Sequence, residues 1–101
     1  PDKQELYTDV FKGAKVVNDS INLCTKNGET HHAVEEGVIT VDDIHAEIGE
    51  IILGKKPGRE NDEEITIFDT VGMAIQDNVT AAAIYKGALE KGLGESYDFL
   101  K

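Results

Sequence analysis

The stretch of sequence that decides the fold is residues 64–77, EITIFDTVGMAIQD. Its first part, residues 65–68, combines β-branched and aromatic side chains and is typical of a buried strand. From about Val71, apolar residues recur at helical spacing as far as Lys91, and Gly92 can end that helix. A strand that passes directly into a long helix indicates an α/β fold with a parallel sheet.

The same alternation extends toward the amino terminus. A short helix from Thr8 to Phe11 precedes a β-branched run, residues 14–19, which predicts a strand. Ser20 can cap a second short helix, and Asn27-Gly28 supplies a turn that tolerates a positive φ. The first third of the chain therefore predicts helix, strand and helix.

Residues 40–53 predict a third helix. Thr40 and Asp43 form a variant of the capping box, and Gly54 with Pro57 can end the helix. Its apolar side chains form one stripe at offsets 0, 3, 7, 10 and 11: Val41, Ile44, Ile48, Ile51 and Ile52. A polar loop, residues 59–63, leads into the strand that follows.

Such a small set of elements needs neighbours. Two or three parallel strands require cover on both faces and at both edges. The apolar stripe of the long helix is also large for the material available to cover it. The chain begins with Pro1, not methionine. We therefore expect either a processed start or a piece of a longer protein, covered by the remaining chain or by a second copy.

Composition and charge exclude several classes of protein. The 101 residues allow one domain, and 20 acidic against 10 basic residues give a net charge of -10. This charge disfavours nucleic acid and anionic membranes as partners. Neither a membrane-spanning apolar run nor a secretory leader is visible. The single Cys24 excludes an internal disulfide and is consistent with a cytoplasmic location.

Motifs for metal binding or nucleophilic catalysis are missing from the sequence. His31 and His32 are adjacent and point in different directions, and His45 is remote, so we expect no metal site. Cys24 lies on an apolar helix face, where a buried inert thiol is expected. There is no glycine-rich dinucleotide fingerprint and no Walker motif.

Two segments each leave two interpretations open. Residues 54–59, GKKPGR, are either an anion cradle or a helix stop followed by a turn. Residues 68–72, FDTVG, join a strand to a helix, where open α/β sheets bind their ligands. The alternative there is an ordinary helix cap by Asp69 or Thr70.

The run GEIILGKKPGR, followed after an acidic spacer by EITIFDTVGMAIQD, resembles the ornithine cyclodeaminase and mu-crystallin family, which includes archaeal-type alanine dehydrogenases. The similarity extends backward through EEGVITVDDIHAE and KGAKVVNDS to PDKQEL, and forward to EKGLG. It covers almost the whole chain in the family's own order.

The resemblance implies the carboxy-terminal part of an NAD- or NADP-dependent enzyme. Residues 1–70 would be the last strands and helices of a Rossmann-like NAD(P)-binding domain. Residues 71–101 would be a long helix and tail that pack on the substrate and dimerisation domain. Family members are homodimers or larger homo-oligomers that transfer hydride from an amino acid through an iminium intermediate. The cyclodeaminases, which are lyases, then form proline.

The resemblance also assigns individual residues. Lys3 matches a cofactor-contacting lysine, and Asp2 stands where the family has glycine. Thr70 matches a serine or threonine that contacts the nicotinamide cofactor, and the Val71 backbone matches a substrate contact. The catalytic aspartate would precede Pro1, so we expect no catalytic residue in this chain.

The isolated chain is therefore expected to be inactive. We can assign Asp77 no role beyond helix-start electrostatics. A second hypothesis is a stand-alone, non-catalytic α/β module that self-associates or binds a partner. A third is nucleotide binding without chemistry.

Overall fold

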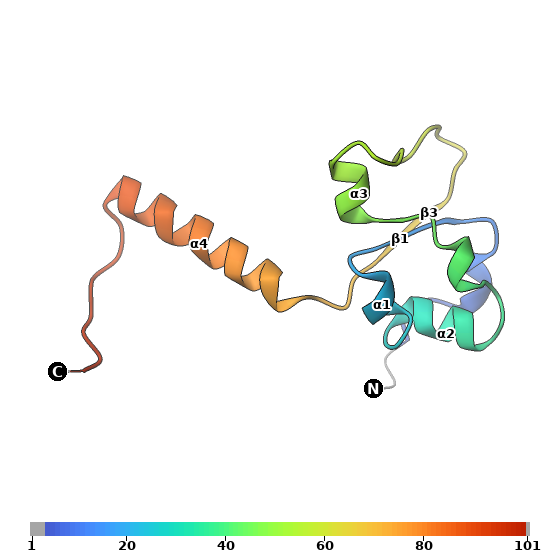
Figure 1. Ribbon diagram of the computed structural model, residues 1–101, viewed down its shortest axis with the longest axis horizontal. Coiled ribbons are helices and arrows are strands. Elements are labelled where there is room, and N and C mark those ends of the chain that lie inside the picture. The colour runs from blue at the N-terminus through green and yellow to red at the C-terminus, as the bar shows by residue number, and fades with distance from the viewer. Residues whose placement is uncertain (1–3, 101) are drawn as a thin grey trace. The chain divides into compact units, whose positions relative to one another are not determined.

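The computed structural model describes residues 4–100, and the chain divides into two compact units, Pro1–Val71 and Gly72–Lys101. The first unit contains two 3-10 helices, three strands and three short α-helices, and the second contains one long α-helix (Figure 1). In chain order the elements are η1 (Thr8–Phe11), β1 (Lys15–Asn18), α1 (Ile21–Cys24), α2 (Glu29–Glu35), η2 (Val41–Asp43), β2 (Ala46–Glu47), α3 (Ile48–Ile52), β3 (Thr66–Asp69) and α4 (Ala74–Lys91).

The three strands form a parallel sheet in the order β2-β1-β3, which confirms the predicted α/β class. Val17 of β1 pairs with Ala46 on one side and with Phe68 on the other. Helices α1 and α2 lie on one side of the sheet, and α3 lies on the other (Figure 1). Because the strands are parallel, their carboxyl ends lie at the same edge of the sheet.

The core lies between the sheet and the layer that contains η1 and α2. Val16 and Ile67 project from the sheet into this layer and are almost fully buried. They belong to one cluster of buried residues with Phe11, Ala33, Ile39 and Ile44. Burial of this single cluster is the main favourable term that holds the unit together.

The prediction of one helix over residues 40–53 is wrong. This segment contains η2, the strand β2 and the short helix α3. The backbone N–H of His45 donates to the carbonyl of Val16, and Ala46 is fully buried beside Val17. Pairing with β1 and burial of Ala46 thus hold this segment as a strand, although its apolar spacing also fits a helix.

The capping interactions expected in this segment are present around shorter elements. The Thr40–Asp43 capping box is confirmed, but it begins the 3-10 turn η2. Hydrogen bonds from the Thr40 backbone N–H, and then from its hydroxyl, hold the pKa of Asp43 below its usual value. A second capping box, Glu47 with Glu50, begins α3. Gly54 follows α3 at φ 72°, as expected for the residue that ends this helical stretch.

Strand β3 is shifted by one residue from its predicted position and is not buried on both faces. Ile67 and Asp69 are buried, whereas Phe68 is 54% exposed on the opposite face. Residue 65 precedes the strand, and its side chain is also exposed. Successive side chains of a strand point to opposite faces, and only one face of β3 is covered. Burial therefore alternates from residue to residue.

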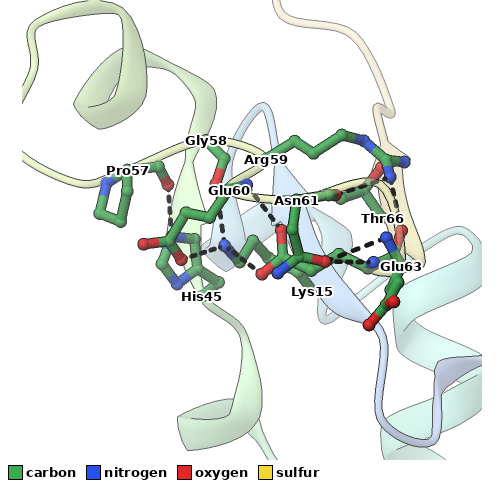
Figure 2. A network of polar contacts seen from close by, with 10 residues as sticks. Lys15, His45, Pro57, Gly58, Arg59, Glu60, Asn61, Glu63 and Thr66 are labelled. Atoms are coloured by element: carbon green, nitrogen blue, oxygen red, sulfur yellow. Dashed lines mark hydrogen bonds and ion pairs between the residues drawn. The ribbon is translucent and has the colours of Figure 1, made fainter.

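A network centred on Lys15 fastens the loop that precedes β3 (Figure 2). The Lys15 ammonium contacts the carboxylates of Glu60 and Glu64, each at 2.8 Å, and donates to the carbonyl of Gly58. Hydrogen bonds to Glu60 and then Glu64 raise the pKa of Lys15, while Lys15 lowers the pKa of Glu64. The polar loop is therefore tied to the amino end of β1.

The second unit consists of α4 and the residues after it. The helix begins at Ala74, three residues later than predicted, and ends at Gly92, which adopts φ 64° as expected. Its apolar side chains, including Ile75, Val79 and Leu89, are about two-thirds exposed. Residues 97–100 form no strand. Over residues 4–100, no helix has the length and apolar character needed to cross a membrane.

Candidate functional site

The carboxyl ends of the three parallel strands bring five polar side chains to one edge of the sheet. Asn18 and Asp19 come from the end of β1, Glu47 from β2, and Asp69 and Thr70 from the end of β3. The register pairs Asn18 with Glu47 on one side and with Asp69 on the other. This edge, defined by these five residues, is called the carboxyl edge below.

Asp19 is the centre of the carboxyl edge. It is 5% exposed, and its carboxylate accepts hydrogen bonds from the backbone N–H of Ser20 at 2.8 Å and from the Cys24 thiol at 3.2 Å. It also accepts from the Thr70 hydroxyl at 2.5 Å and the Val71 backbone N–H at 3.4 Å. One buried carboxylate therefore joins the start of α1 to the segment that leaves β3.

The other two acidic side chains at this edge cap helices of neighbouring segments. Asp69 Oδ2 accepts from the backbone N–H of Thr30, in the first turn of α2, at 2.9 Å. Glu47 Oε1 accepts from the backbone N–H of Ile21, at the start of α1, at 2.9 Å. Neither N-cap residue forms a side-chain cap of its own. These carboxylates therefore satisfy N–H groups that a helix start leaves unpaired.

Cys24 is fully buried, as predicted for an inert thiol. Burial and the hydrogen bond to Asp19 raise the pKa of its thiol to about 12. The thiol is therefore protonated at neutral pH and cannot act as a nucleophile there.

Gly28 allows α2 to approach the carboxyl edge closely. It has φ 93° and ψ -164°, a conformation that is essentially restricted to glycine. A Cβ atom at this position would lie 3.0 Å from Val71 Cγ1 and 3.4 Å from Asp69 Oδ1. The turn expected at Asn27-Gly28 thus also brings the first turn of α2 against β3.

Of the residues that the sequence singled out, Thr70 belongs to the carboxyl edge, and Val71 follows it with its backbone N–H also on Asp19. Thr70 is exposed, and Val71 is 37% exposed. Lys3 lies outside the described residues 4–100. Asp77 lies in the first turn of α4, in the second unit.

Two of the three histidines, His31 and His45, donate a hydrogen bond to a backbone carbonyl. His31 Nδ1 donates to the carbonyl of Thr25, and His45 Nε2 donates to the carbonyl of Pro57. Within residues 4–100, no group of three or more His, Cys, Asp or Glu side chains is arranged to hold a metal ion.

The structure favours the helix-stop interpretation of residues 54–59. The Arg59 guanidinium donates to the carbonyl of Glu64 and to the Thr66 hydroxyl. The Lys56 ammonium donates to the carbonyl of His45 and pairs with Glu50. Lys56 and Arg59 thus bind acceptors of the protein itself, whereas an anion cradle would require them to face a bound anion.

Sequence reasoning missed Asp19 as part of the site. Its sequence context, VVNDS at the end of a β-branched run, parallels IFDT at the end of β3. Two polar residues that follow two neighbouring parallel strands meet at one edge of the sheet. That parallel could have identified Asp19.

Comparison with known proteins gives consistent matches. The model of the ornithine cyclodeaminase/mu-crystallin family matches residues 1–92. Alanine dehydrogenase from Archaeoglobus fulgidus is 50% identical over the whole chain, which covers 31% of that protein. Delta(1)-pyrroline-2-carboxylate reductase from Bacillus cereus is 44% identical over 98% of the chain and 31% of its own length. The chain thus spans less than a third of the length of these relatives.

Solved structures of similar proteins share the fold. An archaeal alanine dehydrogenase dimer with bound NAD superposes with a TM-score of 0.83 at 50% identity, over 98% of this chain and 31% of that one. The Delta(1)-pyrroline-2-carboxylate reductase of Thermococcus litoralis, in complex with NADH and L-proline, gives 0.81 at 42% identity, over 95% and 30%. The family model, the sequence identities and the shared α/β architecture agree, and the chain belongs to the ornithine cyclodeaminase/mu-crystallin family.

Proposed function

We propose that this chain is the carboxy-terminal part of an NAD(P)-dependent amino-acid oxidoreductase or deaminase of the alanine dehydrogenase or ornithine cyclodeaminase type. In this proposal the longer protein transfers hydride between an amino acid and the nicotinamide through an iminium intermediate. It is cytoplasmic and a homodimer. The relatives support the general reaction, since they are named as dehydrogenases and reductases of amino and imino acids.

The observation that carries the proposal is the pairing of Thr70 and Val71 at the carboxyl edge, where both donate to Asp19. Ligands of open α/β sheets bind beyond the carboxyl ends of the strands. Thr70 is exposed at that edge, between Asp69 and Val71, the two residues that a Cβ atom at Gly28 would meet. An exposed hydroxyl next to such a close backbone approach suits a flat polar ring.

The charge of the edge indicates which end of the dinucleotide fits. Asp19 and Asp69 are buried carboxylates, and they favour the cationic ring of oxidised nicotinamide over a phosphate. Carboxylates of the protein already accept from first-turn N–H groups of α1 and α2, so those groups are not free for a pyrophosphate. We therefore propose that Thr70 and Val71 lie at the nicotinamide and substrate end, and that residues preceding Pro1 hold the phosphates.

When bound, the nicotinamide accepts or donates the hydride. In this proposal the chain itself binds and orients: Thr70 contacts the cofactor, the Val71 backbone contacts the amino-acid substrate, and Lys3 adds a cofactor contact. Asp69 serves as a helix cap, and the Cys24 thiol is protonated. The acid/base group is accordingly assigned to the sequence before Pro1.

The domain assignment is part of the same proposal. We assign residues 1–70 to the NAD(P)-binding domain and residues 71–101 to a helix and tail that pack on the substrate and dimerisation domain. The division of the chain into compact units after Val71 agrees with this assignment. The exposed apolar side chains of α4 supply a surface that such packing would cover.

The test begins with the coding sequence upstream of Pro1, where we expect a glycine-rich dinucleotide fingerprint and an aspartate immediately before Pro1. The longer protein should oxidise alanine with NAD or NADP, or interconvert ornithine or a cyclic imino acid. The 101-residue chain alone should show no turnover, because catalysis needs groups positioned by both domains. Turnover by the isolated chain would contradict the assignment of the chemistry to upstream residues.

A second candidate is a non-catalytic module that acts by self-association. It is favoured by the apolar side chains exposed on both units, such as Phe68 at 54% and Ile52 at 77% in the first. Light scattering after size-exclusion chromatography distinguishes the two. A stable dimer of the isolated chain that binds no dinucleotide in calorimetric titration supports this candidate, whereas a monomer contradicts it.

A further inference from the structure

The hydrogen bond between Thr70 and Asp19 has a defined direction. A threonine hydroxyl has one proton to donate and two lone pairs with which to accept. Oδ1 of the Asp19 carboxylate accepts from the backbone N–H groups of Ser20 and Val71, which can only donate. Oδ2 of the same carboxylate faces the Thr70 hydroxyl. Asp19 is therefore the acceptor of this cluster, and Thr70 gives its single proton to Asp19 at 2.5 Å.

Burial keeps this direction in place. Asp19 is 5% exposed, and a carboxylate with so little access to water needs its hydrogen-bond donors. If the Thr70 proton turned toward a ligand, the buried carboxylate would lose a charge-assisted hydrogen bond. The outward side of the Thr70 oxygen thus offers lone pairs only.

We propose that Asp19 is a positioning residue that holds the Thr70 hydroxyl as a hydrogen-bond acceptor, so that this edge selects a cofactor ring carrying an N–H donor. In the nicotinamide ring that donor is the carboxamide N–H group. The inference rests on the proposed function, because it takes Thr70 as a cofactor contact. It adds that Thr70 accepts the hydrogen bond from the cofactor and that Asp19 fixes this direction.

Two NAD analogues of nearly equal shape differ in whether they carry this N–H donor. The 3-acetylpyridine analogue of NAD keeps the carbonyl oxygen but replaces the carboxamide nitrogen with a methyl group. The thionicotinamide analogue keeps the N–H donor. Wild-type protein should bind NAD and the thionicotinamide analogue about 3- to 10-fold more tightly than the acetylpyridine analogue, as for one neutral hydrogen bond.

The matched variant is Asp19→Asn, measured in the longer protein that contains this chain. The side-chain amide of this variant can donate to the Thr70 oxygen, which frees the Thr70 proton to donate to a carbonyl. The ratio of dissociation constants between the acetylpyridine analogue and NAD should then fall to about 2 or less. A ratio unchanged from wild type in folded Asp19→Asn protein overturns the proposal.

An independent readout shows whether Asp19→Asn leaves the cluster assembled. Asp19 helps to raise the pKa of Cys24 through a hydrogen bond and its charge, although burial contributes more. In the folded variant the thiol should react with a disulfide reagent at lower pH than in wild type, but still more slowly than in unfolded protein. This titration requires neither cofactor nor turnover.

Thr70 variants keep the test decisive if Asp19→Asn fails to fold. Thr70→Val removes the hydroxyl and should abolish the preference for NAD over the acetylpyridine analogue, while Thr70→Ser should retain it. Equal preference in wild type and Thr70→Val overturns the proposal. Wild-type protein that binds all three dinucleotides equally also overturns it but leaves the proposed function intact. Failure of wild-type protein to bind any dinucleotide refutes the proposed function itself.

Discussion

Gly28→Ala should destabilise the first unit more than the same change at Gly37 or Gly49. Gly28 combines two constraints, since φ 93° with ψ -164° excludes most side chains and the new Cβ atom would meet Val71 Cγ1 at 3.0 Å. The methyl group would also face Asp69, which caps α2. The change therefore strains the turn and disturbs the junction of α2 with β3.

The magnitude follows from these two constraints and from the entropy of the unfolded chain. A residue forced into this backbone region costs about 1–3 kcal/mol. The contact with Val71 adds an overpacking cost at the low end of the usual range, about 1 kcal/mol, because Val71 is 37% exposed and can shift. Loss of chain entropy in the unfolded state returns about 0.5 kcal/mol. We expect a net loss of about 1.5–3.5 kcal/mol, or roughly 10- to 400-fold in the folding equilibrium.

Two other glycines serve as matched controls. Gly37 has φ 73°, but an added Cβ would meet nothing within 4 Å, so Gly37→Ala should cost only the left-handed backbone term, about 1 kcal/mol. Gly49 lies in α3 without a positive φ and also has open space. Gly49→Ala should be neutral or stabilise the protein by up to about 1 kcal/mol.

Native-state hydrogen exchange of the β1 amides is the suitable assay, because it reports the opening of the first unit independently of α4. The free energy of opening at Val16 and Val17 should fall in the order Gly49→Ala, Gly37→Ala, Gly28→Ala. The reasoning is refuted if Gly28→Ala exchanges no faster than Gly37→Ala. That result would mean that the approach of α2 to β3 is loose enough to admit a methyl group.

Three further predictions concern ionisable groups. Because the pKa of Cys24 is raised to about 12 from 9, its contribution to stability is present below pH 9 and is lost as pH rises toward 12; Cys24→Ala should remove this alkaline part of the stability curve. Because the pKa of Glu64 is lowered, chiefly by its hydrogen bond with Lys15, its contribution is present above the ordinary value of 4.5 and is lost as pH falls through the folded value. Lys15→Met should flatten the acid limb of thermal unfolding, and an unchanged limb would count against this pairing. Asp69→Ala should destabilise the protein by about 1–3 kcal/mol in urea unfolding, because it leaves the buried backbone N–H of Thr30 unpaired, whereas Asp69→Asn keeps an acceptor and should cost less than half as much.

The sequence was sufficient to predict an element wherever its local pattern agrees with its role in the tertiary structure. The β-branched run at β1, the strand and helix on either side of Thr70, and the glycine that ends α4 were all predicted within a few residues. Each has a local physical cause, such as side-chain period or the tolerance of glycine for a left-handed conformation. The family was recognisable for the same reason, because its motifs are continuous stretches.

Only the tertiary structure decided the segment around Ala46. Its apolar spacing fits a helix, but pairing with β1, about 30 residues earlier in the chain, converts its centre into a strand. The carboxyl edge has the same origin. Asp19 and Thr70 are 51 residues apart in sequence, and the backbone N–H of α2 that Asp69 caps lies 39 residues before it. Sequence periodicity describes one element at a time, whereas these contacts depend on which strands become neighbours. The sequence therefore predicted Thr70 as a site residue, and the parallel register of β1 and β3 brought Asp19 within hydrogen-bonding distance of its hydroxyl.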